Sequence, residues 1–107
     1  MTEQGFLSRC EQLLERIEDA LDGAGVDADS MRSGHLMEIE FDDGAKIIVN
    51  GQAPLREIWL ADRSGGYHFR DVDGRWCDTR SGEGLAQVLS RCVSAHCAAP
   101  VTLVLDD

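Results

Sequence analysis

The sequence predicts an α+β domain in which two amphipathic helices accompany an antiparallel β-sheet. Apolar residues recur at three- and four-residue steps near both ends of the chain, as in helices with one buried face. Between these segments, short runs rich in Ile, Val, Phe and Trp are separated by Asn-Gly and Asp-Gly pairs, which is typical of antiparallel strands joined by tight turns.

Length, composition and charge narrow the class of protein. The 107 residues suffice for one domain, 1–107, with a core of its own. We expect a cytoplasmic protein without membrane contact, because signal-peptide features are missing, apolar runs fall short of the roughly 20 residues of a membrane span, and four cysteines suit a reducing compartment.

The negative charge is concentrated in the first part of the chain. Residues 1–43 contain 12 acidic residues against 3 arginines, whereas the whole chain has a net charge of −10. This asymmetry disfavours nucleic acid and favours cations or a basic protein surface as partners.

The first helix is expected from Glu3 to about Asp22. Its apolar stripe consists of Phe6, Cys10, Leu13, Leu14, Ile17 and Leu21. One flank carries only acidic residues, namely Glu11, Glu15, Glu18, Asp19 and Asp22. Arg9 and Arg16 lie on the opposite flank, too far round to pair with most of them. Like charges at helical spacing cost about 0.2–0.5 kcal/mol each, so this flank indicates either a functional surface or a solvated acidic face.

The acidic character continues beyond the helix. Asp27 and Asp29 are expected in a linker, and Glu38 and Glu40 on the polar face of a strand whose other face carries Met37, Ile39 and Phe41. After an Asp43-Gly44 turn, two strands are predicted at Lys46–Val49 and Leu55–Ala61, with Asn50 and Gly51 in the loop between them. Ile58 and Leu60 share one face of the second strand, so Trp59 points outward, toward a partner or beneath a covering segment.

The remaining segments complete the predicted domain. Further strands are expected around Tyr67–Phe69 and at Arg75–Asp78, and a last one at Val101–Leu105. Ser81 is expected to cap a second helix, whose core stripe is Leu85, Val88, Leu89, Cys92 and Val93. Cys97 with His96 offers a soft-metal or haem alternative, although the spacing is not that of a zinc site. Nucleophile, P-loop and dinucleotide motifs are missing, so we expect no enzymatic activity.

Three segments together resemble the bacterial frataxin family: N-G-Q-A-P-L-R-E-I-W-L-A (residues 50–61), G-G-Y-H-F (65–69) and R-S-G-E (80–83). The resemblance implies a sandwich with two helices packed on one face of the antiparallel sheet, and a protein of iron–sulfur cluster assembly that binds iron weakly through an acidic ridge. That ridge corresponds here to Glu18, Asp19 and Asp22, with Asp27 and Asp29 just beyond. Gly23 and Gly25 stand where bacterial relatives often carry further acids, so the ridge is thinner at that end.

The resemblance also implies partners, namely the cysteine desulfurase and the scaffold on which clusters are built. Their expected contact residues are Glu38, Glu40, Asn50, Gln52 and Trp59, and the expected iron ligands are Glu11, Glu15, Glu18, Asp19, Asp22, Asp27 and Asp29. A regulator that binds only protein, with incidental metal binding, is the alternative function. We expect a monomer, with iron-dependent oligomers as the alternative.

Overall fold

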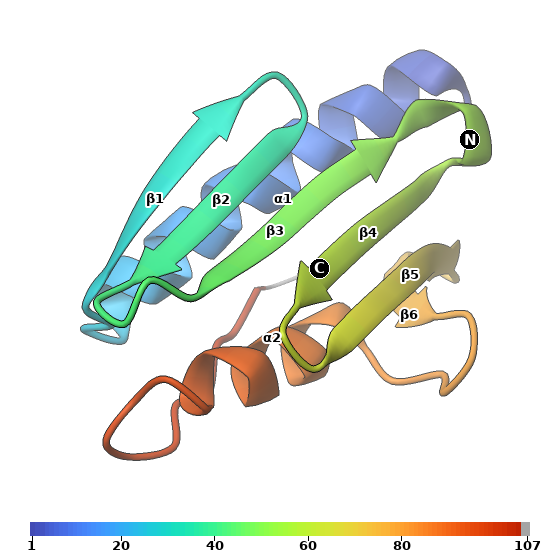
Figure 1. The fold of residues 1–107 in the computed structure, drawn as a ribbon. Helices are drawn as coiled ribbons and strands as arrows, with labels where there is room; N and C mark the ends of the chain where they lie inside the picture. Colours follow the sequence, from blue (N-terminus) through green and yellow to red (C-terminus); the bar gives the residue numbers. More distant parts are fainter. Residues whose placement is uncertain (106–107) are drawn as a thin grey trace.

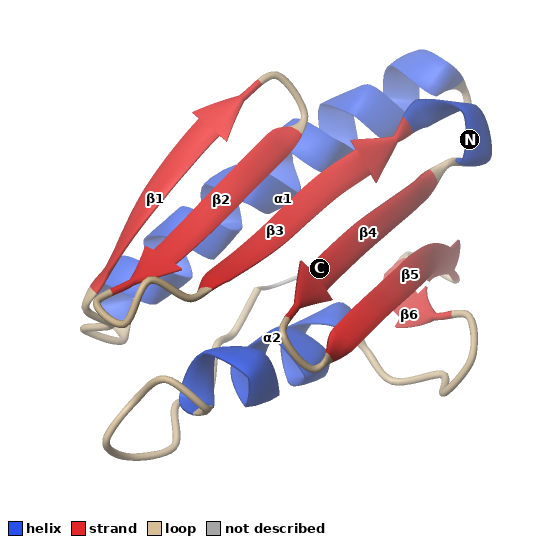
Figure 2. Cartoon of the chain, viewed as in Figure 1, coloured by secondary structure: helices blue, strands red, loops and turns tan. Residues whose placement is uncertain are grey.

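A computed structural model describes residues 1–105 of the chain (Figure 1). The elements are α1 (Glu3–Gly23), β1 (Ala28–Ser33), β2 (Leu36–Phe41), β3 (Lys46–Gln52), a 3-10 turn (Ala53–Leu55), β4 (Glu57–Asp62), β5 (Gly65–Val72), β6 (Arg75–Asp78) and α2 (Leu85–Ser94). The six strands form one antiparallel sheet in sequence order. Both helices pack against this sheet (Figure 2), which confirms the predicted fold class.

One continuous apolar core lies between the helices and one face of the sheet. The predicted stripes of both helices are buried in it, together with the strand residues Met37, Ile39, Val49, Ile58, Leu60 and Phe69. Thr2 caps α1 by accepting a hydrogen bond from the Gly5 amide. Within residues 1–105, neither helix is long and apolar enough to cross a membrane.

All four cysteines are free, and two of them belong to the core as predicted. Burial raises the pKa of the Cys10 thiol to about 11 and that of Cys92 to about 12. Because the thiolate is the reactive form of cysteine, both are unreactive packing residues at neutral pH.

The acidic linker predicted after α1 is wrong in part, because residues 28–33 form strand β1. Five of its six residues are exposed, so the strand lacks the apolar alternation that reveals a half-buried strand in a sequence. β1 is the edge of the sheet and pairs with β2 through a turn at Gly34-His35. Asp29 therefore lies on a strand, directly opposite Glu40.

The loop predicted at Asn50 and Gly51 is also wrong, because β3 continues to Gln52. Gly51 is present for close packing rather than for a turn. A Cβ atom at this position would lie 2.6 Å from the Cys10 Sγ of α1. The helix and the strand can approach this closely only because residue 51 has no side chain.

Two predictions near the C-terminus are corrected as well. Residues 101–105 bury Leu103 and Leu105, but they have no regular secondary structure and pair with none of the described strands. Their backbone bonds instead to α2, since the Leu103 amide donates to the Ser90 hydroxyl at 2.9 Å and the Val101 amide to the Ser94 hydroxyl at 2.8 Å. The alternation correctly indicates that Leu103 and Leu105 are buried, but the segment is bound to helix α2 rather than to a strand.

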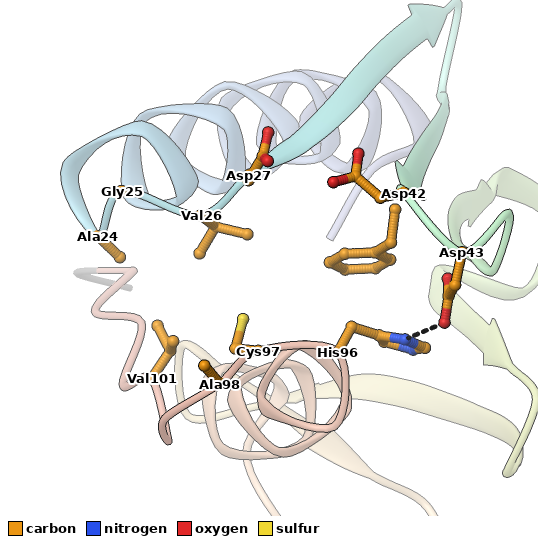
Figure 3. Close-up of a pocket in the computed structure, with 11 residues that line it drawn as sticks. Ala24, Gly25, Val26, Asp27, Asp42, Asp43, His96, Cys97, Ala98 and Val101 are labelled. Carbon is orange, nitrogen blue, oxygen red and sulfur yellow. Dashed lines mark ion pairs between the residues drawn. The ribbon is translucent and has the colours of Figure 1, made fainter.

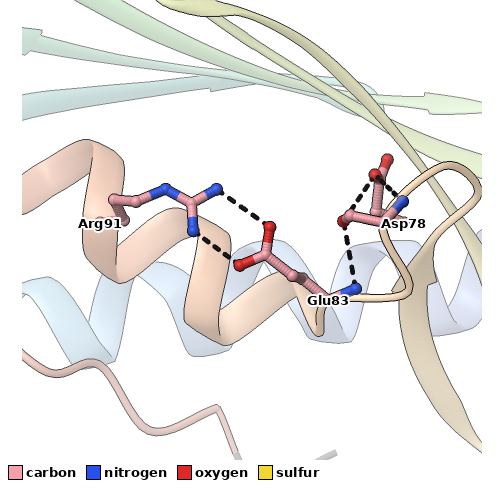
Figure 4. Close-up of polar contacts among 4 residues, drawn as sticks. Asp78, Glu83 and Arg91 are labelled. Atoms are coloured by element: carbon pink, nitrogen blue, oxygen red, sulfur yellow. Dashed lines mark hydrogen bonds and ion pairs between the residues drawn. The ribbon is translucent and has the colours of Figure 1, made fainter.

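Ser81 does not cap α2, whose N-cap is Gly84 without a side-chain bond. The preceding loop is held by buried Asp78, which accepts bonds from the Ser81 amide and hydroxyl at 2.9 Å each (Figure 4). Burial opposes ionisation of Asp78, but these hydrogen bonds outweigh it and lower its pKa. Glu83 precedes the helix and pairs with Arg91 at 2.6 Å, so it anchors the loop to α2.

Candidate functional site

The acidic flank of α1 is exposed to solvent as the helical periodicity predicted. Glu11, Glu15, Asp19 and Asp22 are exposed. Glu18 is only half exposed, because Arg32 Nη1 of β1 lies 2.8 Å from its Oε1 and Ser30 Oγ lies 3.5 Å from its Oε2. The hydrogen bond to Glu18 raises the pKa of Arg32. The predicted lack of counter-charges is therefore wrong at Glu18, since the cation comes from a strand that the sequence pattern did not reveal.

Further carboxylates carry the negative charge from α1 around the edge of the sheet. Asp27 and Asp29 are exposed at and beside the start of β1. Glu40 lies across from Asp29, and Glu38 lies 3.9 Å from the amino group of Lys46. We use the name acidic ridge for Glu11, Glu15, Glu18, Asp19, Asp22, Asp27 and Asp29. The structure thus places exposed acids along one flank of α1, at the start of β1 and on the exposed face of β2.

The acidic ridge does not form a preassembled metal cage. Among residues 1–105, no three His, Cys, Asp or Glu side chains come together in an arrangement that could hold a metal ion. A cation on the ridge would therefore be held by few carboxylates and keep part of its water shell. Such a surface suits weak and poorly selective binding of hard cations.

Neutralising the ridge acids that have no ion-pair partner among residues 1–105 should stabilise the protein. We expect the amide variant Glu15→Gln, Asp19→Asn and Asp22→Asn to gain about 0.5–1 kcal/mol, since each like-charge neighbour on a helix costs about 0.2–0.5 kcal/mol. A thermal melt measures the change. Glu18→Gln is the matched control, because it breaks the ion pair with Arg32 and should not stabilise. If the amide variant melts several degrees lower than the unaltered protein, these acids are structural and the functional interpretation fails.

The predicted partner-binding residues all lie on the sheet face opposite the helices, which we call the outer face. Residues paired across antiparallel strands share a face. Asn50 pairs with Trp59 and Gln52 with Glu57, whereas the neighbouring Val49–Leu60 pair is buried in the core. The outward orientation of Trp59 is therefore confirmed by the structure. Its side chain is half-buried, so it is accessible and yet supported by neighbours.

The support comes from residues that the sequence pattern does not single out as a site. Glu57 is 5% exposed and accepts a hydrogen bond from Trp59 Nε1 at 2.9 Å. Its other oxygen accepts from Arg70 Nε at 2.9 Å. His68 stacks on the indole of Trp59, with ring centroids 4.3 Å apart and planes 9° apart. The Trp59 hydrogen bond, followed by that from Arg70, lowers the pKa of Glu57 against the opposing effect of burial.

His96 and Cys97 line a cavity of about 430 Å³ between the end of α1, the β2–β3 turn and the end of α2 (Figure 3). The imidazole of His96 stacks on Phe41 with centroids 4.3 Å apart, and its Nδ1 lies 3.5 Å from Asp43 Oδ2. His96 thus has a packing role and an acidic neighbour. These side chains belong to no group of three metal ligands among the described residues, so the soft-metal alternative gains no support.

The fold agrees with the comparisons to known proteins. The frataxin-like domain family matches residues 1–99, and the chain belongs to this family. The iron-sulfur cluster assembly protein CyaY of Ralstonia nicotianae is 51% identical over 99% of this chain and 97% of its own length. CyaY of Vibrio cholerae is 46% identical over 97% of this chain and its full length.

Solved structures with a similar fold are also frataxins. Frataxin from Psychromonas ingrahamii superposes with a TM-score of 0.90 at 32% identity and covers 97% of this chain and 99% of its own. Trimeric frataxin from the yeast Saccharomyces cerevisiae, in a ferrous complex, has a TM-score of 0.66 at 26% identity over 83% of this chain and 81% of its own. The resemblance predicted from residues 50–83 is thereby confirmed.

Proposed function

We propose that this protein acts in iron–sulfur cluster assembly as a cytoplasmic, non-enzymatic component. In this role it binds iron weakly through the acidic ridge and modulates the complex of the cysteine desulfurase and the scaffold. The observation that carries the proposal is the set of exposed acids along α1 and at the start of β1, in a chain that matches relatives named for cluster assembly along nearly its whole length. Iron is cargo here rather than a resident cofactor.

The chemistry of the ridge suits iron delivery or sensing better than storage. Carboxylate oxygens are hard ligands and bind hard cations, but exposed carboxylates discriminate little among them. Exposure also leaves the charges open to screening by salt. A cation bound in this way exchanges readily, which a donor requires.

Iron binding to the isolated protein should accordingly be weak. We expect competition from calcium or manganese and loss of binding at high salt. Isothermal titration calorimetry measures the iron affinity and its dependence on salt and on competing cations. It compares the unaltered protein with the variant Glu18→Gln, Asp19→Asn and Asp22→Asn. Tight iron binding that does not depend on salt and persists in the triple variant would show that the iron site lies outside the acidic ridge.

The alternative function is a regulator that binds only protein, with incidental metal binding. Two observations favour it: among the described residues no three ligands converge, and Glu18 is engaged by Arg32. In this alternative the acids steer the protein onto a basic patch of the desulfurase. An effect on the desulfurase that the protein exerts equally with and without iron would select the alternative.

Both functions require that the acidic ridge steers binding to the desulfurase. Charges act at long range, so the amide variant of Glu15, Asp19 and Asp22 should associate more slowly and with a flatter salt dependence. Binding kinetics on immobilised desulfurase at two salt concentrations measure both effects. Glu3→Gln, compared with the single substitution Asp22→Asn, is the charge-matched control, because Glu3 lies at the start of α1, far from the last turns. Equal association rates for the two variants would contradict the proposal.

A further inference from the structure

The outer face is electrically polarised across its width. Acidic side chains lie on β1 and β2, at Asp29, Glu38 and Glu40. On the other side of Trp59, β5 presents His68 and Arg70 on the same face, since His68 pairs with Trp59 and Arg70 with Glu57. Lys46 of β3 offsets part of the acidic charge, because its amino group lies 3.9 Å from Glu38. The remaining charge favours a partner with cations over β1 and β2 and an anion over β5.

Arg70 is prepared for such an anion. Its side chain is 66% exposed, and both its ion pair and its hydrogen bond to Glu57 use Nε. Neither terminal nitrogen has a hydrogen-bond or ion-pair partner among residues 1–105, and the two form the planar fork that matches a carboxylate. The neighbouring acid on β5, Asp71, pairs with Arg9 at 3.1 Å and does not compete for Arg70.

Glu57 fixes the geometry of both presented groups. A carboxylate with 6% side-chain exposure holds the indole nitrogen of Trp59 with one oxygen and the guanidinium of Arg70 with the other. The indole donor is thereby satisfied, so the ring offers a partner an apolar surface that needs no acceptor. Groups held in this way lose little rotational freedom on binding.

An apolar hollow of about 170 Å³ lies beside the aromatic stack. It exists because the two smallest residues of the face, Ala61 and Gly66, are directly opposite each other. Its other lining residues are Ile48, Asn50, Trp59, Leu60 and His68, of which Asn50 and His68 are polar. Gly66 and Arg70 are four residues apart on β5, or about 13 Å at the rise of a strand.

From these observations we propose that the outer face around β4 and β5 is a preorganised receptor for a protein element that carries an apolar side chain and a carboxylate about 13 Å apart. The apolar side chain enters the hollow beside Trp59, and Arg70 binds the carboxylate. Glu57 is the positioning residue of this receptor. The inference rests on the proposed function, because it specifies the chemistry of the assembly partner that docks there.

The test measures binding to the purified desulfurase–scaffold complex. We expect Arg70→Gln to weaken binding about tenfold, which corresponds to about 1.4 kcal/mol, mainly through faster dissociation. Arg70→Lys should recover little of it, because an ammonium lacks the fork. Arg80→Gln, which removes an exposed arginine of the loop after β6, is the control and should bind within about twofold of the unaltered protein.

The role of Glu57 has its own readout. Glu57→Gln keeps an acceptor for the indole but loses the charge that holds Arg70, so the Trp59 Nε1–H resonance should stay protected from exchange while affinity falls as in Arg70→Gln. Glu57→Ala should lose both the exchange protection of the Trp59 Nε1–H and the affinity for the partner. A loss of affinity in Trp59→Ala but not in Arg70→Gln overturns this inference alone, whereas unchanged binding in Trp59→Ala overturns docking through the outer face as a whole.

Discussion

Trp59→Ala is expected to weaken binding to the assembly complex by about 2 kcal/mol or more, because large aromatic anchors near the centre of an interface dominate its energy. The loss should appear in the dissociation rate, in contrast to the slower association expected of the ridge variants. The fold should persist. Trp59 lies on the outer face, and its removal leaves Ile58 and Leu60 packed in the core and Glu57 paired with Arg70.

The second tryptophan provides the contrast. Trp76 is 2% exposed, meets Phe6 edge-on with centroids 6.0 Å apart and lies beneath the guanidinium of Arg9. Trp76→Ala should therefore cost about 3–5 kcal/mol of stability, whereas Trp59→Ala should melt close to the unaltered protein. Thermal melts of both variants, with binding kinetics of Trp59→Ala, check the assignment. If Trp59→Ala unfolds the domain, the outer face is structural and not a contact surface.

Gly51→Ala is expected to destabilise the protein by about 1–3 kcal/mol, the usual cost of forcing extra volume into a packed core. The new methyl group would lie 2.6 Å from Cys10 Sγ and 3.4 Å from His35 Cβ. The melting temperature should fall by roughly 4–8 °C for each kcal/mol in a domain of this size.

A double variant identifies the cause of the effect. Cys10→Ala removes the sulfur that the new methyl group would meet, so Gly51→Ala should cost less in that background than in the unaltered protein. Contacting residues couple by about 0.5–3 kcal/mol in such cycles. Additive effects of the two substitutions would show that Gly51 is needed for another reason.

Sequence periodicity revealed every element that buries one face. The stripes of α1 and α2 and the alternation of Met37, Ile39 and Phe41 each encode a buried surface, so they could be predicted. β1 could not, because an exposed edge strand buries almost nothing and leaves no apolar pattern. Because β1 was not predicted, the ion pair between Arg32 of that strand and Glu18 could not be predicted either.

In the candidate site, the features that lie within one helix or strand could be predicted, and those that join two strands could not. Exposed acids on one helical flank and an outward tryptophan on a strand follow from spacing alone, because residues on one element have fixed relative positions. The link between Glu57, Trp59 and Arg70 joins two strands and depends on their register. Only the Glu57–Trp59 spacing of two residues, which puts both on one face, was visible in the sequence.

The most direct test of the central proposal is the rate of cluster assembly by purified desulfurase and scaffold, with and without this protein, at several iron concentrations. The proposal predicts that the protein changes the rate, that the change depends on iron, and that both the ridge amide variant and Trp59→Ala reduce it. A rate that is the same with and without the protein at every iron concentration would contradict the proposed function.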